Sequence, residues 1–207
     1  RMALDYAVSH NRKSVTFVHK GNIMKFTEGA FRNWGYEVAR EEYGDYTITE
    51  DELYEKYSGT QPDGKIVVKD RIADAMLQLV LTRPEEYDIL AMPNLNGDYF
   101  SDAIVAQVGG LGLAPSSNMA KDRFVFEASH GTAPKYAGQN KVNPGSLILT
   151  AAMMLDTIGF KEADALITKG VAGAIEKKTV TYDLERLMEG ATTVSTSGFG
   201  EKIIENM

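Results

Sequence analysis

The chain has 207 residues, of which 43% are hydrophobic and 25% charged, as in an ordinary globular protein of about one or two domains. Its net charge of −7 and the lack of any run rich in Lys and Arg argue against a nucleic-acid partner. Without cysteine it forms no disulfide, thiolate metal site or cysteine nucleophile. No apolar run approaches the ~18 residues of a membrane span, and no signal peptide opens the sequence. We therefore expect no membrane segment and a cytoplasmic location.

The first ten residues, RMALDYAVSH, have the pattern of the second half of an amphipathic helix. They contain neither an initiator Met at position 1 nor a capping residue before the helix. We therefore expect this chain to be a piece of a longer protein.

The next segment pairs a strand with a helix. Residues 14–18 (SVTFV) predict a buried strand, the polar run HKGN follows at 19–22, and residues 23–43 predict one long helix. Open α/β sheets bind ligands where strands end before helices. Lys20 is thus either a catalytic lysine, with a pKa lowered by a metal ion or a closed cleft, or an ordinary exposed lysine.

A polar stretch comes next, at residues 44–64, and predicts an irregular surface insertion. Residues 65–68 predict a strand, 70–81 a helix and 87–92 another strand. Asp74 lies beside the apolar stripe of the predicted helix. It is either an exposed helix residue or a carboxylate that the helix delivers to a site.

The segment NLNGDYFSDAIVAQVGG, residues 94–110, is the most informative one. Its Asn-Gly pair predicts a turn, which places Asp98 in the first turn of a helix. Asp102 follows four residues later and shares its face. Two such carboxylates can bind one hard divalent cation. Alternatively, Asp98 only favours the start of the helix and Asp102 is solvated.

A loop rich in glycine and small residues lies further along. The run GGLG at 109–112 ends the previous helix. A strand-like segment then passes through Leu113 into 115–118, and residues 124–127 predict a strand. Residues 128–138 (ASHGTAPKYAG) follow, and loops of this composition let backbone N–H groups approach an anionic or flat ligand. The loop matches neither GxGxxG nor GxxxxGKS, so it is either a functional loop or an ordinary connection.

The last third of the chain predicts helices. Asn143 and Pro144 predict the N-cap and first residue of a helix that ends at Gly159. Residues 161–178 predict a second helix. The run VTYD at 180–183 leads into a short helix that carries Arg186, and residues 197–207 form a terminal amphipathic segment.

Four segments together resemble the NADP-dependent isocitrate dehydrogenases of the bacterial homodimeric type: VHKGNIMKFTEGAF, NLNGDYFSDAIVAQVGGLGLAP, EASHGTAPKYAGQNKVNPGS and KTVTYDLERLMEG. The resemblance covers nearly the whole chain except residues 44–64, and corresponds to the carboxyl-terminal half of such an enzyme. It implies the α/β fold of isocitrate and isopropylmalate dehydrogenases, which is not a Rossmann fold. Residues 1–108 would belong to the small domain with the metal site and dimer contacts, and 109–207 to the large domain with the NADP-binding loop.

The implied activity is the oxidative decarboxylation of isocitrate to 2-oxoglutarate, with NADP and Mg²⁺ or Mn²⁺ as cofactors. By resemblance, Asp98 is the main metal ligand with Asp102 beside it. Asp74 is a further ligand, donated by the second subunit of a homodimer with shared active sites. Lys20 is a catalytic lysine that also crosses the dimer interface, and Asn22 lies near the nicotinamide and the substrate.

The resemblance also implies the cofactor contacts. Lys135, Tyr136, Tyr182 and Arg186 match positions that read the 2′-phosphate of NADP, and cations with phenolic donors suit a dianionic phosphate. No acidic residue stands near Lys135 to bind the ribose hydroxyls of NAD, so we expect NADP. The cofactor loop and the residue that follows it match the family at His130, Gly131, Thr132, Ala133, Lys135, Tyr136 and Asn143.

The residues that hold the substrate carboxylates in the family fall in the amino-terminal half of such enzymes. A tricarboxylate needs several arginines, and none of those here matches these roles (Arg32, Arg40, Arg71 and Arg83). We therefore expect this chain to be inactive without that half. Three alternatives stay open: a relative that acts on isopropylmalate or tartrate, a non-catalytic subunit or binding fragment, and an unrelated Mg²⁺-dependent phosphoryl-transfer enzyme.

Overall fold

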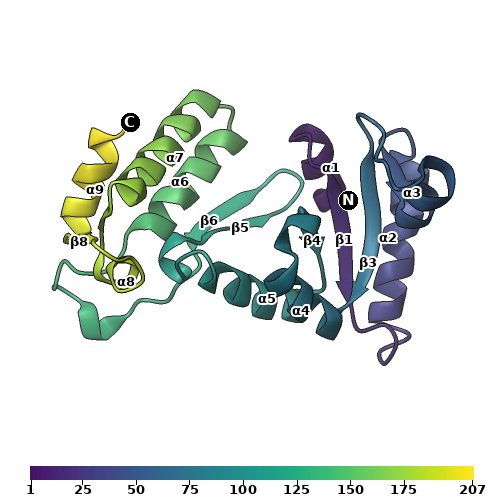
Figure 1. The fold of residues 1–207 in the computed structure, drawn as a ribbon, viewed down its shortest axis with the longest axis horizontal. Helices are drawn as coiled ribbons and strands as arrows, with labels where there is room; N and C mark the ends of the chain where they lie inside the picture. Colours follow the sequence, from purple (N-terminus) through teal and green to yellow (C-terminus); the bar gives the residue numbers. More distant parts are fainter. The chain divides into compact units, whose positions relative to one another are not determined.

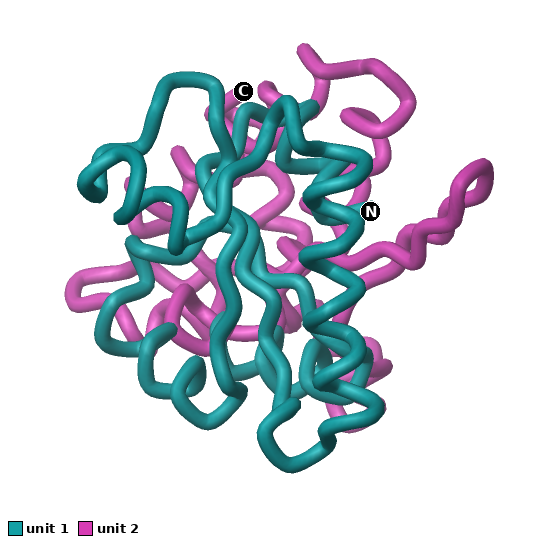
Figure 2. Tube along the Cα trace, turned by 90° about the vertical axis from the view of Figure 1, so that its right-hand side faces the viewer, with its two compact units in different colours: residues 1–104 teal, residues 105–207 magenta.

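The computed structural model describes all 207 residues, which divide into two compact units (Figures 1 and 2). Unit 1 comprises Arg1–Ile104 and unit 2 comprises Val105–Met207. Their assignment to the small and large domains of the family stays a prediction. None of the helices combines the length and the apolar character needed to cross a membrane.

Unit 1 is built on a parallel four-stranded sheet in the order β2-β3-β1-β4. Every residue of the central strand is buried, which fits a run of β-branched and apolar residues covered on both faces. The strand predicted at 14–18 is thereby confirmed. The strands are β1 (Ser14–His19), β2 (Thr47–Thr49), β3 (Ile66–Ile72) and β4 (Ile89–Ala91).

Five α-helices and a 3-10 turn (Pro84–Glu86) connect and cover this sheet. The last α-helix runs two residues past Ile104 into unit 2. The helix expected within the first ten residues is confirmed. The helices are α1 (Met2–Ser9), α2 (Glu28–Tyr43), α3 (Glu50–Tyr57), α4 (Ala73–Thr82) and α5 (Asn94–Ala106).

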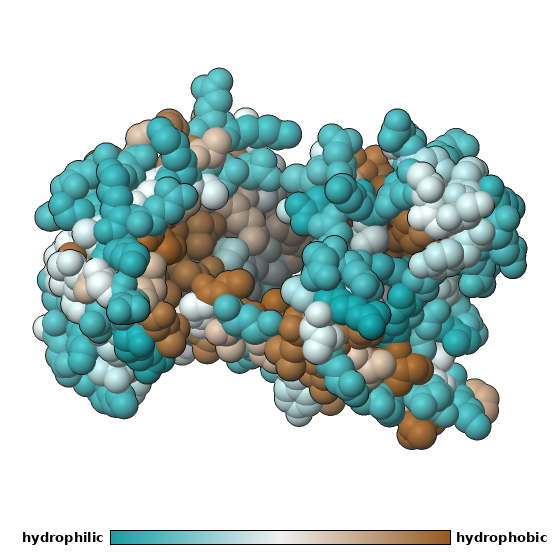
Figure 3. Space-filling view, in the orientation of Figure 1, coloured by the Kyte–Doolittle hydropathy of each residue, from teal (hydrophilic) through white to brown (hydrophobic).

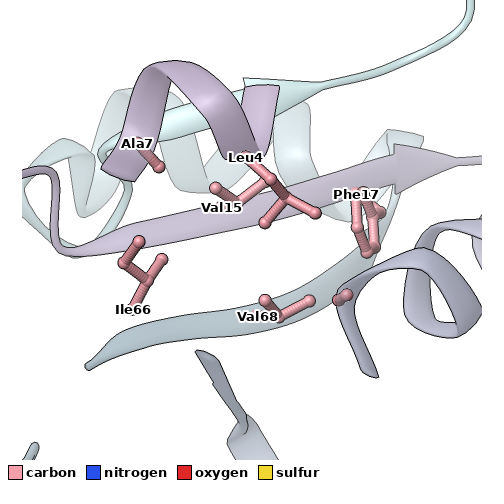
Figure 4. Packing of buried hydrophobic residues seen from close by; sticks show 7 residues of the cluster. Leu4, Ala7, Val15, Phe17, Ile66 and Val68 are labelled. Carbon is pink, nitrogen blue, oxygen red and sulfur yellow. The ribbon is translucent and has the colours of Figure 1, made fainter. Parts of the chain in front are cut away.

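Side chains of β1 enter two different cores, because successive residues of a strand point to opposite faces. Val15 and Phe17 belong to a cluster shared with α1, α2 and β3 (Figure 4). The Phe17 ring meets the Phe31 and Tyr36 rings edge-on. Val18 points the other way and packs with buried residues of α4 and α5. β1 is therefore held from both sides.

Unit 2 contains an antiparallel pair of strands, a short parallel pair and four α-helices. Its core joins α7, α8 and α9 through Val171, Leu184 and Phe199. The strands predicted at 115–118 and 124–127 and the helix at 161–178 are confirmed. The elements are β5 (Pro115–Met119), β6 (Phe124–Ala128), α6 (Gly145–Thr157), α7 (Lys161–Glu176), β7 (Thr179–Val180), α8 (Tyr182–Glu185), β8 (Thr192–Thr193) and α9 (Thr196–Glu205).

Apolar side chains also lie on the surface of unit 1, along α5 and in the turn between β1 and α2 (Figure 3). Leu95 and Tyr99 of α5 are more than half exposed, and Phe26 in the turn is 94% exposed. Exposed apolar patches of this kind are typical of interfaces with another chain or segment.

The prediction of one helix over residues 23–43 is wrong at its start, because α2 begins only at Glu28. The preceding residues form turns in which Gly21 packs against Gly29. A Cβ on Gly21 would lie 2.8 Å from the Gly29 Cα, so this approach requires glycine. Such a long-range contact has no local signal.

The prediction of an irregular insertion at residues 44–64 is also wrong, because this stretch contains β2 and α3. Thr49 begins α3 with a capping box. Its hydroxyl accepts from the Glu52 N–H at 3.2 Å, and the Glu52 carboxylate accepts from the Thr49 N–H at 3.0 Å. The sequence carries the signature of this motif, a Thr followed three residues later by Glu.

Three other boundaries differ from the predictions. The Asn-Gly pair at 96–97 lies inside α5, which begins at Asn94, so Asp98 occupies the second turn. The helix predicted at 70–81 begins at Ala73, because β3 continues its pairing with β1 as far as Ile72. Asn143 is not the N-cap of α6, because Pro144 holds that position. The side-chain Oδ1 of Asn143 accepts from the Gly145 N–H at 2.8 Å.

The capping box makes a prediction for stability. Thr49→Ala removes the acceptor for the Glu52 N–H, so the free energy of unfolding should fall by about 0.5–2 kcal/mol. Urea denaturation followed by circular dichroism measures the change. Thr60→Ala, at an exposed position in the turn after α3, is the matched control and should change stability by less than about 0.5 kcal/mol. Equal losses in the two variants would contradict the role of the cap.

Candidate active-site residues

Lys20, Asp74 and Asp98 all follow strands of the unit 1 sheet. Lys20 comes directly after β1, Asp74 is the second residue of the helix after β3, and Asp98 lies on the helix after β4. The register pairs His19 with Ile72, so β1 and β3 end side by side. The carboxyl edge of a parallel sheet is where ligands bind in open α/β proteins.

The structure brings two of the expected catalytic residues into contact, since the Lys20 ammonium donates to the Asp74 carboxylate. This hydrogen bond is the main reason why the pKa of Asp74 lies below its usual range. The Asp74 side chain remains 68% exposed and keeps oxygen lone pairs open to solvent. The pair can therefore present a cation and an anion together.

Asp98 and Asp102 lie one turn apart on α5, and both are exposed. No side-chain hydrogen bond or ion pair occupies either carboxylate. Nowhere in this chain do three or more His, Asp or Glu side chains converge as a metal site would require. The set Asp74, Asp98 and Asp102 is therefore not assembled within one chain, and its role stays a prediction. The two helix carboxylates suit a hard divalent cation that takes further ligands from elsewhere.

The segment around Lys20 is held by a residue that the sequence did not indicate. The Glu28 carboxylate, in the first turn of α2, accepts from the Lys20 backbone N–H at 2.5 Å and from the Asn96 side chain at 2.9 Å. It thus links the end of β1 to α5. Asn22 is exposed, with no contact that assigns it a role.

A partly buried chain of hydrogen bonds lies beneath the same segment. His19 is 1% exposed; its Nε2 lies 2.9 Å from Asp70 Oδ2, and the Tyr36 hydroxyl donates to Asp70 Oδ1 at 2.8 Å. Burial, with the Asp70 hydrogen bond second, raises the pKa of Tyr36 well above its usual range. The sequence did not indicate this chain, because it predicts that His19 follows its strand and that Asp70 begins a helix, whereas both residues lie in strands.

In unit 2, the loop residues from His130 to Lys135 are exposed and Tyr136 is half-buried. His130 Nδ1 lies 2.9 Å from the Gly131 carbonyl oxygen, and a Cβ on Gly131 would meet only open space. Ala133 has φ +43°, a left-handed conformation that is uncommon outside glycine. It is the N-cap residue of the 3-10 turn Pro134–Tyr136, so a left-handed residue begins this turn.

Cations and phenols gather at the end of this loop. The Tyr136 and Tyr182 ring centroids lie 5.8 Å apart, and Lys135 Nζ lies 4.9 Å from the Tyr136 centroid. Lys141, which the sequence reading missed, places its Nζ 4.6 Å from the Tyr182 centroid. The pKa of Tyr136 is lowered by its interaction with Tyr182 and then by Lys135, whereas the Tyr136 interaction raises the pKa of Tyr182. The donors of this cluster are of the kind that suits a phosphate dianion, and their role stays a prediction.

Two further expected cofactor residues lie beside this cluster. Arg186 is exposed, and its Nε donates to the Asp183 carbonyl oxygen at 3.2 Å. Asn143 is 7% exposed, and its amide donates to the Asp183 carboxylate at 3.0 Å. The Asn143 amide therefore ties the loop to α8, and a direct cofactor contact by it stays a prediction. Thr132 is exposed, and its side chain makes no hydrogen bond that assigns it a role.

Comparison with known proteins shows which family this chain belongs to. The family model for isocitrate/isopropylmalate dehydrogenase matches residues 1–203. The chain is 62% identical, over all its 207 residues, to a protein of Archaeoglobus fulgidus named isocitrate dehydrogenase [NADP]. It is 59% identical over its full length to a protein of the same name from Pseudomonas aeruginosa. It covers 50% and 49% of these proteins, so the chain spans about half the length of the curated relatives it matches.

A solved structure of this family has the same fold as the chain. The crystal structure of isocitrate dehydrogenase from Methylococcus capsulatus superposes with a TM-score of 0.82 at 35% identity, and the match covers 100% of this chain and 54% of that one. The expected α/β fold is thereby confirmed. The chain belongs to the isocitrate/isopropylmalate dehydrogenase family.

Proposed function

We propose that this chain forms part of an NADP-dependent isocitrate dehydrogenase, which oxidises and decarboxylates isocitrate to 2-oxoglutarate. The observation that carries the proposal is sequence identity of 52% to 62%, over the whole chain, to relatives named isocitrate dehydrogenase [NADP]. The two candidate sites lie within this matched region. The bacterial and archaeal sources of these relatives also support a cytoplasmic location.

The residues of unit 1 would hold the metal and move a proton. Asp98 and Asp102 would bind Mg²⁺ or Mn²⁺, with Asp74 as a further ligand. When bound, the ion supplies Lewis-acid stabilisation of negative charge on the substrate, and NADP accepts the hydride. The Lys20 ammonium would exchange a proton with the 2-oxygen of the substrate or with the adjacent carbon. Its contact with Asp74 supports this role, because the pair brings the proton donor next to a metal ligand.

The residues of unit 2 would select NADP over NAD. Lys135, Lys141 and Arg186 supply positive charge, and Tyr136 and Tyr182 supply phenolic hydroxyls. A 2′-phosphate is a dianion with three acceptor oxygens, so it suits this group of donors better than a pair of ribose hydroxyls does.

The metal assignment is tested with Asp98→Asn in the protein that carries this chain at family length. The amide binds a divalent ion poorly, so NADPH formation that depends on isocitrate and Mg²⁺ should fall by roughly 100-fold or more. Asp63→Asn, an exposed Asp in the turn before β3, should keep full activity. Isopropylmalate and tartrate are assayed in parallel; faster turnover of either by the unmodified protein would overturn the choice of isocitrate.

Cofactor selection is tested with the double substitution Lys135→Ala and Arg186→Ala. Each lost charge-assisted hydrogen bond is worth about 1.5–3 kcal/mol, so the KM for NADP should rise at least tenfold. The KM for NAD should change little. Lys161→Ala, an exposed lysine at the start of α7, is the control. A similar rise for both cofactors would contradict a role in reading the 2′-phosphate.

We also propose that the protein is a homodimer in which each active site takes residues from both subunits. The exposed apolar turn next to Lys20 supports such an interface, since Phe26 is 94% exposed. Lys20→Ala and Asp98→Asn chains are unfolded and refolded together. If each site takes Lys20 from one subunit and Asp98 from the other, mixed dimers contain one intact site, and about a quarter of the activity returns. Asp98→Asn mixed with Asp102→Asn should recover nothing. Equal recovery in both mixtures, or none in either, contradicts the sharing.

A further inference from the structure

The ring of His19 is the most buried ionisable group next to the proposed active site, and the proposed reaction does not use it. It is 1% exposed, yet both of its nitrogens have partners. Nδ1 lies 2.9 Å from the Gly21 backbone nitrogen, and Nε2 lies 2.9 Å from Asp70 Oδ2. The ring therefore bridges β3 and the turn that follows Lys20.

These contacts fix which nitrogen of a neutral ring carries the proton. A backbone N–H can only donate, so Nδ1 must be the acceptor for Gly21. The proton then lies on Nε2 and is donated to Asp70, whose other oxygen accepts from the Tyr36 hydroxyl. Tyr36 and His19 thus both donate to Asp70, and Gly21 donates to His19, so the four residues form one hydrogen-bonded network that links α2, β3 and the turn.

The peptide groups on both sides of the Lys20 side chain are anchored by these contacts. The Lys20 N–H donates to Glu28, and the next N–H, that of Gly21, donates to the His19 ring. The space around Gly21 is also filled, because a Cβ on this residue would lie 2.8 Å from both His19 Nδ1 and the Gly29 Cα. The Cα of Lys20 thus has little freedom to move.

We propose that His19, oriented by Asp70 and Tyr36, is a positioning residue for Lys20 and acts through the Gly21 peptide group. Its effect on turnover rests on the proposed function, whereas its anchoring of the turn does not. The His19 ring contacts neither substrate nor cofactor in this role. It limits where the Lys20 ammonium can lie, and small displacements of a reacting group cost large factors in rate.

Two substitutions separate the two hydrogen bonds of the ring. In His19→Asn the shorter amide can place its oxygen near the position of Nδ1 and accept from Gly21, but it loses Asp70. In His19→Gln the longer amide can place its nitrogen near the position of Nε2 and donate to Asp70, but it loses Gly21. Each variant gives up one buried hydrogen bond, so a purely structural role predicts similar losses in both.

The kinetic test uses the protein that carries this chain at family length, with isocitrate, NADP and Mg²⁺. We expect kcat to fall about tenfold to 100-fold in His19→Gln and to stay within about threefold in His19→Asn. The KM for NADP should change little in either variant, because the residues proposed to bind the 2′-phosphate belong to unit 2. Equal losses of kcat in both variants, or no loss in His19→Gln, overturn the proposal.

The anchoring is tested separately by hydrogen exchange, read by mass spectrometry on peptides that cover residues 18–26. Exchange should become faster in His19→Gln and stay near the unmodified rate in His19→Asn. If the unmodified protein oxidises no isocitrate, the proposed function fails, and this difference in exchange still supports the anchoring. Unchanged exchange in His19→Gln, or equally faster exchange in both variants, overturns it.

Discussion

The parallel pairing of β1 with β3 is the constraint on which the rest of unit 1 depends. Residues from Ser14 to His19 lie opposite those from Val67 to Ile72, so both strands end at the same edge. A shift of this register by one residue would move every buried side chain to the other face. The cores on the two faces of β1 prevent such a shift, because Phe17 and Val18 each fill one of them. The position of Lys20 beside Asp74 follows from this packing.

The two units supply complementary chemistry in a chain with a net charge of −7. Unit 1 presents carboxylates on α5 and the Lys20–Asp74 pair, which suit a divalent cation and proton transfer. Unit 2 collects Lys135 and Lys141 around two phenols. Such a grouping of ammonium groups and phenolic hydroxyls matches the donors that suit a phosphate group, and its ligand stays a prediction.

Partly buried polar contacts explain how the turn between β1 and α2 can hold the Lys20 side chain in place. The turn after β1 has little apolar burial of its own, since Phe26 is exposed. Its order comes from hydrogen bonds to Glu28 and to the His19 ring, and from the close contact of two glycines. Hydrogen bonds in a region sheltered from water are stronger and more directional than exposed ones. The turn thereby gains rigidity without a hydrophobic cluster.

Local sequence determined those features that depend on neighbouring residues alone. The β-branched run of β1, the apolar periodicity of α7, the breaking of α5 by glycines and the placement of Lys20 after a strand could all be read from it. The family resemblance, carried by four segments, identified the fold. Even the cap of α3 was readable, since Thr49 and Glu52 have the required spacing. Local sequence is sufficient to predict the conformation of a residue whose main interactions are with neighbours in its own turn or strand.

Only the tertiary structure decided several element boundaries and side-chain contacts, because these depend on residues that are distant along the chain. The Gly21–Gly29 contact delays α2, and pairing with β1 extends β3 to Ile72. The bond between Lys20 and Asp74 joins two strand ends, and the His19–Asp70–Tyr36 chain joins three elements. Lys141 joins the group of cations and phenols because the fold brings the Tyr136 and Tyr182 rings next to its ammonium. No local pattern encodes such contacts, since their free energy arises only when the sheet and helices have packed.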